Sequence, residues 1–370
     1  MKIHVVSLTI PWPPNYGGAI DIFYKLKSLH KLGVQIHLHC YKYDRDETEE
    51  LKKYCYKVSY YDRRLKIIDT LSLTPFIVKS RVNKKLVDEL NKDNSKILIE
   101  GVHGFSIYKY VDNSRIYIRT HNVEQDYYWA LMKASNSYHK KFYYWTEFLK
   151  LRNYENKLKK AKGVLCISPN DLALFEKINK NSVLISPFHE HEYINCDAGM
   201  GEYILLHGNL QVEENIKSIK YLINNVLNKI DHKIIIAGRQ PDESIIKLCE
   251  QYQHIMLLSN LSQNEMIQLI KGSQIILLHT FQSTGIKLKL VNSLYLGRHV
   301  ICNSLMVDNT NLNQLVYIAN NDRMWINTIN QLMTKTFTKQ NANDRQVVLE
   351  QFYNNKINAK RIISILQKTN

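Results

Sequence analysis

Glycines directly before the first predicted helix could bind a phosphorylated ligand. Gly17 and Gly18 stand between the first predicted strand and that helix. Glycines at a helix start let a ligand approach the backbone N–H groups, and the helix N-terminus favours negative charge. The stretch is not G-x-G-x-x-G, so it gives little support to a nicotinamide or flavin site. The alternative is a tight strand-to-helix turn with no ligand.

A histidine follows a later predicted strand, within the sequence Arg119-Thr-His121-Asn122-Val-Glu124. Asn122 is suited to cap the next helix. A histidine in such a loop can bind sugar hydroxyls or act as a general base. The alternative for His121 is a structural histidine with satisfied hydrogen bonds.

Two loops in the second half of the chain could also bind phosphate. Gly208 and Asn209 follow one predicted strand, and the glycine would let a phosphate or ribose lie close to the backbone. Gly238 and Arg239 follow the next strand, and a guanidinium offers a planar fork of donors to a diphosphate. The alternatives are ordinary helix capping in the first loop and a surface arginine in the second.

The segment 281–303 is the most informative, because it predicts a loop, an apolar helix, a glycine and a short strand. Ser283 or Thr284 can cap the helix, which is apolar on nearly every face and is therefore expected to be buried. Lys287 on a buried helix is costly unless it has a partner. An anion at the helix start would provide one and would also bind the first backbone amides. The alternative is that Lys287 and Lys289 extend to water.

Short apolar strands alternate with amphipathic helices along the whole chain, and they must position these residues. Strands are predicted at 2–9, 34–40, 96–100, 115–119, 163–167, 182–185, 203–207, 233–237, 255–258, 274–279 and 299–303. Helices are predicted at 19–32, 213–227 and 356–367, among others. Runs rich in Ile, Val and Leu are typical of strands buried on both faces of a parallel sheet.

The alternation is interrupted between residues 189 and 201, which we interpret as a linker. Two α/β alternations predict two doubly wound, Rossmann-like domains that face each other across a cleft. We expect them at 1–190 and 191–349, with a final helix at about 350–370 packing back onto the first. Because ligands bind beyond the carboxyl ends of the strands in such sheets, the cleft is the expected site.

The net charge is +16, from 50 Lys and Arg against 34 Asp and Glu. Such a charge points to an anionic partner, which could be nucleic acid, an acidic membrane or a phosphorylated small molecule. A lysine-rich, solvated surface is the alternative. The basic and aromatic stretch 140–160 is expected either to contact an anionic membrane peripherally or to form a packed helix.

The six cysteines include no CxxC pair, and three of them lie in predicted strands. We expect buried, reduced thiols and therefore a cytoplasmic location. No apolar stretch approaches the ~20 residues that span a bilayer. Asp44 and Asp46 have a DxD form but lie in a charged loop, and His37 with His39 is more simply structural. We therefore expect no metal site.

The order of the motifs resembles the group 1 family of GT-B glycosyltransferases, especially bacterial members with a G-x-K-x-K signature. The motifs are the glycines at 17–18, His-Asn-x-Glu at 121–124, His-Gly-Asn-Leu at 207–210, Ala-Gly-Arg at 237–239 and Gly-Ile-Lys-Leu-Lys at 285–289. The resemblance covers nearly the whole chain. It implies that the second domain binds a nucleotide-sugar, and that most members retain the anomeric configuration without a metal.

Four residues, two in each of two motifs, differ from those that are usual in the family. Thr284 and Asn292 stand where two glutamates are common, and Asn209 and Asn215 stand where an arginine and a lysine are usual. The resemblance then implies that lysine, arginine and helix amides hold the diphosphate, and that Asn292 contacts the ribose.

These arguments predict two sets of residues. The catalytic set is His121, Gly17, Gly18, Lys287 and Arg239. The donor-binding set is Gly208, Asn209, Gly238, Arg239, Ser283, Thr284, Gly285, Lys287, Lys289 and Asn292. The expected activity is sugar transfer from a nucleotide-diphosphate sugar to a glycan or lipid-linked acceptor, in surface polysaccharide or glycolipid synthesis, with no separate cofactor.

Two alternatives from other classes stay open at this point. A sugar-nucleotide epimerase of similar fold would form product with no acceptor present. A non-catalytic basic protein would bind an anionic polymer with an affinity that falls steeply with salt. The sequence has no recognised nucleic-acid motif, so nucleic acid is not an expected partner.

Overall fold

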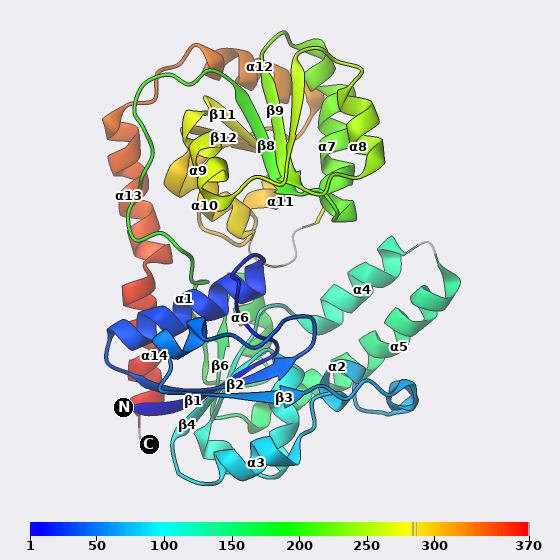
Figure 1. The fold of residues 1–370 in the computed structure, drawn as a ribbon, viewed down its shortest axis with the longest axis vertical. Helices are drawn as coiled ribbons and strands as arrows, with labels where there is room; N and C mark the ends of the chain where they lie inside the picture. Colours follow the sequence, from blue (N-terminus) through cyan, green and yellow to red (C-terminus); the bar gives the residue numbers. More distant parts are fainter. Residues whose placement is uncertain (136, 283–284, 286, 369–370) are drawn as a thin grey trace. The chain divides into compact units, whose positions relative to one another are not determined.

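The computed structural model describes residues 1–135, 137–282, 285 and 287–368 of the chain. These residues form two compact units (Figure 1). Unit 1 consists of Met1–Glu190 and Tyr353–Asn370, and unit 2 of His191–Phe352. Each unit is an α/β layer structure with its own parallel sheet.

Among the described residues, unit 1 has a seven-stranded sheet with the order β3-β2-β1-β4-β5-β6-β7. The strands are β1 Lys2–Ser7, β2 Gln35–Lys42, β3 Lys57–Asp62, β4 Lys96–Glu100, β5 Ile116–Arg119, β6 Gly163–Cys166 and β7 Ser182–Leu184. Every pairing is parallel, so all carboxyl ends meet at one edge of the sheet.

Helices cover both faces of this sheet. They are α1 Gly17–Lys31, α2 Phe76–Lys79, α3 Lys84–Leu90, α4 Glu124–Ala134, α5 Tyr138–Glu155, α6 Pro169–Phe175 and α14 Asn355–Gln367. The 3-10 helices are η1 Glu50–Lys53, η2 Ile67–Leu71, η3 Val102–Lys109, η4 Asn113–Arg115 and η5 Asn156–Lys160. The last helix, α14, packs against α1, so the end of the chain returns to unit 1 (Figure 1).

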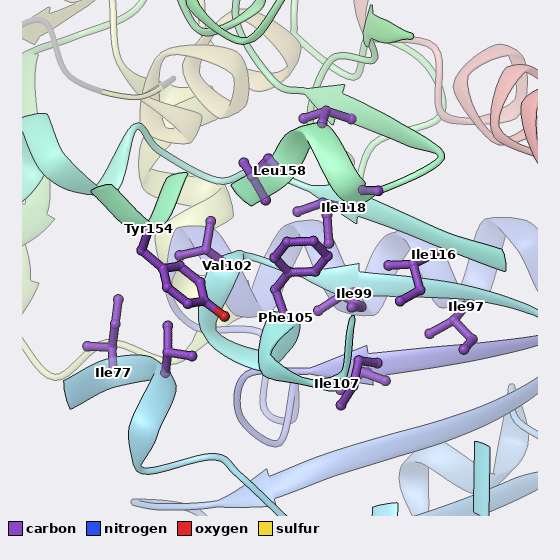
Figure 2. Close-up of a cluster of buried hydrophobic side chains, with 14 of the residues drawn as sticks. Ile77, Ile97, Ile99, Val102, Phe105, Ile107, Ile116, Ile118, Tyr154 and Leu158 are labelled. Carbon is purple, nitrogen blue, oxygen red and sulfur yellow. The ribbon is translucent and has the colours of Figure 1, made fainter. Parts of the chain in front are cut away.

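Side chains alternate along the central strands and so supply two cores. Ile97 and Ile99 of β4 point toward Phe105 and Leu158 on one face (Figure 2). Leu98, between the two isoleucines, belongs to the core on the other face, under α1 and α14. This period of two, with both sets apolar, explains why the strands are continuous apolar runs.

In the described part of unit 2, the sheet has six parallel strands with the order β10-β9-β8-β11-β12-β13. The strands are β8 Ile204–Asn209, β9 Ile234–Arg239, β10 Ile255–Ser259, β11 Ile275–Leu278, β12 His299–Cys302 and β13 Tyr317–Ile318. The helices are α7 Glu213–Asn225, η6 Leu227–Lys229, α8 Glu243–Cys249, α9 Gln263–Gly272, α10 Leu288–Leu296, α11 Ser304–Val307, η7 Asn313–Leu315, α12 Asp322–Met333 and α13 Lys339–Tyr353. This strand order is that of a doubly wound dinucleotide-type fold.

The predicted fold class is confirmed, and the predicted strands are present with ends shifted by one or two residues. Two strands were not predicted, β3 and β13. Both lie at a sheet edge and are only partly buried. β3 has the mixed sequence Lys-Val-Ser-Tyr-Tyr-Asp and β13 is only two residues long, so both lack the continuous apolar run on which the prediction depends.

The predicted start of the buried helix in unit 2 is wrong. Ser283 and Thr284, proposed as caps, lie outside the described residues. α10 begins only at Leu288, with Lys287 as its N-cap residue. Gly285 has a φ of 65°, a left-handed conformation that a right-handed helix cannot contain. The first helical amides of α10 therefore belong to Leu288 and Lys289.

A buried carboxyl group joins two helices of unit 1. Glu155, at the end of α5, accepts a hydrogen bond of 2.8 Å from the N–H of Glu124, the first residue of α4. Its other oxygen, Oε2, has no hydrogen-bond partner among the described residues. Burial raises the pKa of Glu155 to about 8, so the acid is protonated at neutral pH.

We expect Glu155→Gln to remove part of the pH dependence of stability. The folded state binds the Glu155 proton more tightly than the unfolded chain, so this contribution is present at low pH and is lost as the pH rises through about 8. The amide keeps an acceptor for Glu124 and does not titrate. At pH 8.5 the variant should be more stable than wild type by on the order of 1–3 kcal/mol, with little difference near pH 5.

Urea unfolding at both pH values measures this effect. Glu176→Gln, which changes an exposed acid of the same unit, is the control and should alter neither value. An equal loss of stability at both pH values would contradict the burial of a protonated Glu155.

Candidate active site

Four charged side chains are buried at the carboxyl edge of the unit 1 sheet. Asp21 and Lys25 lie one turn apart on α1, Glu100 is the last residue of β4, and Arg119 is the last residue of β5. None is more than 2% exposed. Buried charges require partners, because removing an ion from water costs several kcal/mol. Of these four residues, only Arg119 lies in a motif recognisable in the sequence, and the other three carry no such signal.

These side chains form one neutral network. Lys25 Nζ lies 2.7 Å from Glu100 Oε2 and 3.2 Å from Asp21 Oδ2. Arg119 donates twice to Asp21, from Nε to Oδ2 at 3.1 Å and from Nη2 to Oδ1 at 2.8 Å. Two cations therefore balance two anions inside the fold. The paired, bidentate geometry is the strongest form of such a contact.

The network keeps both carboxylates ionised. Burial by itself raises the pKa of Asp21, but the charges of Arg119 and Lys25 outweigh it and hold that pKa well below its usual range. Burial likewise raises the pKa of Glu100, while Lys25 and then His121 lower it, and the net shift is downward.

His121 lies against this network. Its Nε2 is 3.0 Å from Glu100 Oε2, and its Nδ1 is 3.8 Å from Asp21 Oδ2, which is beyond hydrogen-bond distance. The side chain is 11% exposed. When Nε2 carries the proton, it donates to Glu100 and leaves a lone pair on Nδ1, as a general base requires. Glu100 is thus the residue that orients His121.

Gly17 and Gly18 are the first two residues of α1, the helix that carries Asp21 and Lys25. A Cβ at Gly18 would lie 3.2 Å from the ring of Tyr16, the N-cap residue. The glycines thus begin the helix that the ionic network fixes. This placement agrees with the predicted strand–glycine–helix order.

Several buried polar atoms follow the strands of unit 1 and have no hydrogen-bond partner among the described residues. They are Thr9 Oγ1 after β1, Glu100 Oε1 and His103 Nδ1 at the end of β4, and Thr120 Oγ1 after β5. Buried polar groups are normally paired, so each such atom needs an explanation. Small threonines gave no signal in the sequence, and only their common position after parallel strands identifies them.

In unit 2, α7 and α10 bring polar side chains to the end of β8. Asn215 of α7 donates to the backbone O of Asn209 at 2.9 Å and accepts from Lys289 Nζ at 3.0 Å. His207 of β8 is 2.9 Å from the Ser293 hydroxyl of α10. The structure thereby brings Lys289 to Asn215, from which it is 74 positions away in the sequence, beside Asn209.

Lys287 and Lys289 share this region with one carboxylate. Lys287 Nζ is 3.9 Å from Glu214 Oε1, and its side chain is only 17% exposed. The alternative that both lysines extend to water therefore does not hold. Burial lowers the pKa of Lys289 to about 8 and that of Lys287 in the same direction, while Glu214 opposes both shifts.

Glu214 belongs to the site only through contacts with distant residues, so it was not among the predicted site residues. It also accepts hydrogen bonds from Thr280 Oγ1 and from Gln282 Nε2, in the segment after β11. Two lysines thus face one glutamate, leaving an excess of positive charge in a poorly solvated place. A bound anion would balance that excess.

The remaining predicted donor residues lie nearby or are already engaged. Gly208, Asn209, Gly238 and Arg239 are at the adjacent ends of β8 and β9, and Arg239 is exposed. Asn292 Oδ1 accepts from His191 Nε2 at 2.6 Å, so a ribose would have to share or replace that bond.

Gly238 also has a structural reason to be glycine. A Cβ there would lie 2.1 Å from the backbone O of Gly208. This contact alone excludes larger residues, whether or not a ligand binds. Packing therefore explains why position 238 is glycine, and contact of Gly238 with the donor stays a prediction.

A metal at the unit 1 network is disfavoured. Asp21, Glu100 and His121 offer ligand atoms within 4.8 Å of one another. However, Lys25 and Arg119 already form ion pairs with both carboxylates, so a metal ion would have to displace these two cations.

Comparisons with known proteins agree with this architecture. The family described as "Glycosyl transferases group 1" matches residues 201–335, which include the lysine region of unit 2. A Klebsiella pneumoniae protein named "Uncharacterized 44.6 kDa protein in cps region" is 30% identical over 347 residues, covering 87% of this chain and 88% of that protein.

Solved structures share the fold at low identity. TarM from S. aureus has a TM-score of 0.70 at 12% identity, with 99% of each chain covered. A glycosyltransferase from Rickettsia africae has a TM-score of 0.63 at 15% identity, covering 100% of this chain and 99% of that one. The lipopolysaccharide outer core galactosyltransferase WaaB has a TM-score of 0.64 at 11% identity, covering 98% and 99%.

The chain belongs to the group 1 glycosyltransferases and has the GT-B fold. The predicted family and enzyme class are thereby confirmed. Within the described residues, no helix is long and apolar enough to cross a membrane.

The lysine region makes a pH-dependent prediction. A nucleoside diphosphate should bind more weakly as the pH rises above about 8, because Lys289 then loses its proton. The fall should approach tenfold per pH unit, because one proton is coupled to binding. Isothermal titration with the tightest binder among UDP, GDP, CDP, ADP and dTDP measures it.

Lys289→Arg should flatten this profile, because a guanidinium does not titrate in this range. Lys229→Arg, on an exposed turn of the same unit, is the matched control and should keep the wild-type profile. An unchanged decline in Lys289→Arg would show that another group is responsible.

Proposed function

We propose that this glycosyltransferase moves a sugar from a nucleotide-diphosphate donor to a lipid-linked glycan acceptor, with retention of configuration and without a catalytic metal. The observation that carries the proposal is the pair of poorly solvated lysines, Lys287 and Lys289, at the start of α10. Their excess charge suits the diphosphate of such a donor. Retention is supported only by the resemblance to the family.

The proposed roles follow from where charge develops. Breaking the bond between sugar and phosphate leaves negative charge on the diphosphate and positive charge on the anomeric carbon. Lys287, Lys289 and Arg239 would stabilise the leaving diphosphate, aided by the first amides of α10. Glu214 would hold the lysines in place until the donor binds.

Unit 1 would bind the acceptor. In the candidate site of unit 1, His121 is partly exposed and can contact a sugar hydroxyl, which both donates and accepts. Nδ1 of His121 would accept the proton of the acceptor hydroxyl or bind the transferred sugar. Glu100 would act as a positioning residue for this histidine.

The name of the Klebsiella pneumoniae relative places that protein in a cps region. This supports a role for the present chain in surface polysaccharide or glycolipid synthesis on the cytoplasmic side of the membrane. The rival epimerase reaction would proceed without an acceptor, so omission of the acceptor separates the two reactions.

An exposed apolar surface on unit 1 supports a membrane-borne acceptor. Tyr138, Phe142, Trp145 and Leu149 form a stripe along α5 and are 87%, 66%, 43% and 38% exposed. Their spacing of four, three and four residues places them on one side of the helix. The opposite side of α5 packs inward through residues such as Leu151. One side of α5 therefore packs against the core of unit 1, and the other side exposes apolar side chains to solvent.

A second apolar segment adjoins this stripe. Leu65, Ile67, Ile68, Leu71 and Leu73, in and around η2, are 57–94% exposed. Lys150 of α5 donates to the backbone O of Thr70 at 2.5 Å, which fixes η2 beside α5. Basic residues occur in both segments, Lys140 and Lys141 in α5 and Lys66 directly before η2. Apolar and basic groups together are typical of surfaces that bind anionic lipid.

Lys287→Ala should remove most transfer while leaving the fold intact. Loss of one group that stabilises the leaving charge typically costs on the order of 100-fold in rate. Release of nucleoside diphosphate from a panel of nucleotide-sugars, with a lipid-linked glycan extract as acceptor, measures it. Lys229→Ala is the control for a lost surface charge. Wild-type turnover by Lys287→Ala would rule out the proposed donor site.

Phe142→Ser combined with Trp145→Ser should abolish binding to phosphatidylglycerol vesicles, because the two side chains are the central part of the α5 stripe. Wild type should sediment with these vesicles and much less with phosphatidylcholine vesicles. Val347→Ser, which removes an exposed apolar side chain of unit 2, is the matched control. Equal sedimentation of the double variant and wild type would exclude this surface as the membrane contact.

A further inference from the structure

Three buried histidines lie on one face of the unit 1 sheet and take no part in the proposed function. His4 of β1 is opposite His37 of β2, and His39 follows two residues later on the same face. They are 1%, 2% and 0% exposed, respectively. His4 and His37 are each the third residue of their strand, so they lie toward the amino ends. The candidate active site is at the carboxyl ends.

The three rings converge. His4 Nδ1 is 2.9 Å from His39 Nε2, and the ring centroids of His37 and His39 are 3.9 Å apart. One ring nitrogen from each histidine lies within 4.8 Å of the other two. Three nitrogen atoms at this spacing are close to the arrangement that a single tetrahedral ion requires.

The outer nitrogens of two of these rings are already held. His4 Nε2 is 3.1 Å from Asp93 Oδ1, and His39 Nδ1 is 2.9 Å from the Tyr61 hydroxyl. A metal-binding histidine almost always donates its second N–H to a carboxylate, carbonyl or water, which fixes the ring and the tautomer. Without an ion, His4 Nδ1 and His39 Nε2 share one proton in their 2.9 Å hydrogen bond. An ion would displace that proton, and the outer partners would then hold both rings with their lone pairs directed inward.

His37 has the same arrangement. Its Nε2 is 2.9 Å from the Ser59 hydroxyl, one strand further along the sheet. No hydrogen bond within the described part of the chain engages its Nδ1. That atom is available to an ion, while Ser59 orients the ring.

The three histidines are neutral, which is the state that binds a metal ion. Burial lowers the pKa of all three histidines, that of His37 to about 4, so the rings are neutral near pH 7. Ligation needs a neutral imidazole. The neighbouring lysines are paired, Lys2 with Asp93 at 2.7 Å and Lys57 with Glu89 at 2.9 Å, and so add little net repulsion.

We propose that His4, His37 and His39 bind one transition-metal ion, of which Zn²⁺ is the best suited, at the end of the sheet opposite the candidate active site. Imidazole nitrogens suit Zn²⁺, and three of them leave a fourth position for water. Two nitrogens on a tetrahedral zinc are about 3.3 Å apart. The 2.9 Å contact between His4 and His39 would therefore open by a few tenths of an ångström. The ion would join β1 to β2 and stabilise unit 1.

Titration of tag-free, EDTA-treated full-length protein with ZnCl₂ tests the site. We expect one equivalent to bind and to raise the melting temperature, and one equivalent of Co²⁺ to give the visible absorption of a tetrahedral nitrogen site. His37→Gln should weaken binding at least tenfold, and Asp93→Asn, which alters only an outer partner, should weaken it less. His30→Gln, at an exposed histidine, should bind as wild type does.

Two results would overturn the proposal. One is the absence of a saturable single equivalent and of a tetrahedral Co²⁺ spectrum in the wild-type protein, which requires no variant to fold. The other is wild-type affinity in a folded His37→Gln protein. Sugar transfer is not part of this test, so failure of the metal site and failure of the proposed function are separate outcomes.

Discussion

The pairing of Asp21 with Arg119 is the constraint on which the architecture of unit 1 depends. Neither charge could be buried alone, because each would lose several kcal/mol of hydration. Together they join α1 to the end of β5, and Arg119 also donates to the backbone O of Ile185 beyond β7. The N-terminus of α1 and the loop of His121 are thereby held at one edge of the sheet.

The two units share a strand order but differ in charge balance at the carboxyl ends. In unit 1, Lys25 and Arg119 match Asp21 and Glu100, so the charges balance without a ligand. In unit 2, two lysines share a single glutamate and have lowered pKa values. A charge-balanced network holds its own side chains in place, whereas a network with excess positive charge favours the binding of an anion. The same topology can therefore hold His121 in place in unit 1 and offer two lysines to an anion in unit 2.

Prediction from sequence was accurate for elements that the local residue pattern determines. It was inaccurate where backbone conformation or contacts with distant residues determine the structure. The central strands were found because their side chains are apolar on both faces, as Ile97, Leu98 and Ile99 illustrate. β3 was missed because its polar and aromatic sequence, Lys57–Asp62, lacks that pattern. The start of α10 was misplaced because the left-handed Gly285 is a backbone property that residue type permits but does not require.

By itself, the sequence determined the alternation of strands and helices, the glycines and lysines that follow the strands, and through their order the family. Only the tertiary structure decided which polar side chains meet. Asp21 and Arg119 are 98 positions apart, and Glu214 reaches Gln282 across 68. Local periodicity reports which face of an element is apolar, but not which distant charge will neutralise a buried one. That choice is made when parallel strands bring their carboxyl ends to a common edge.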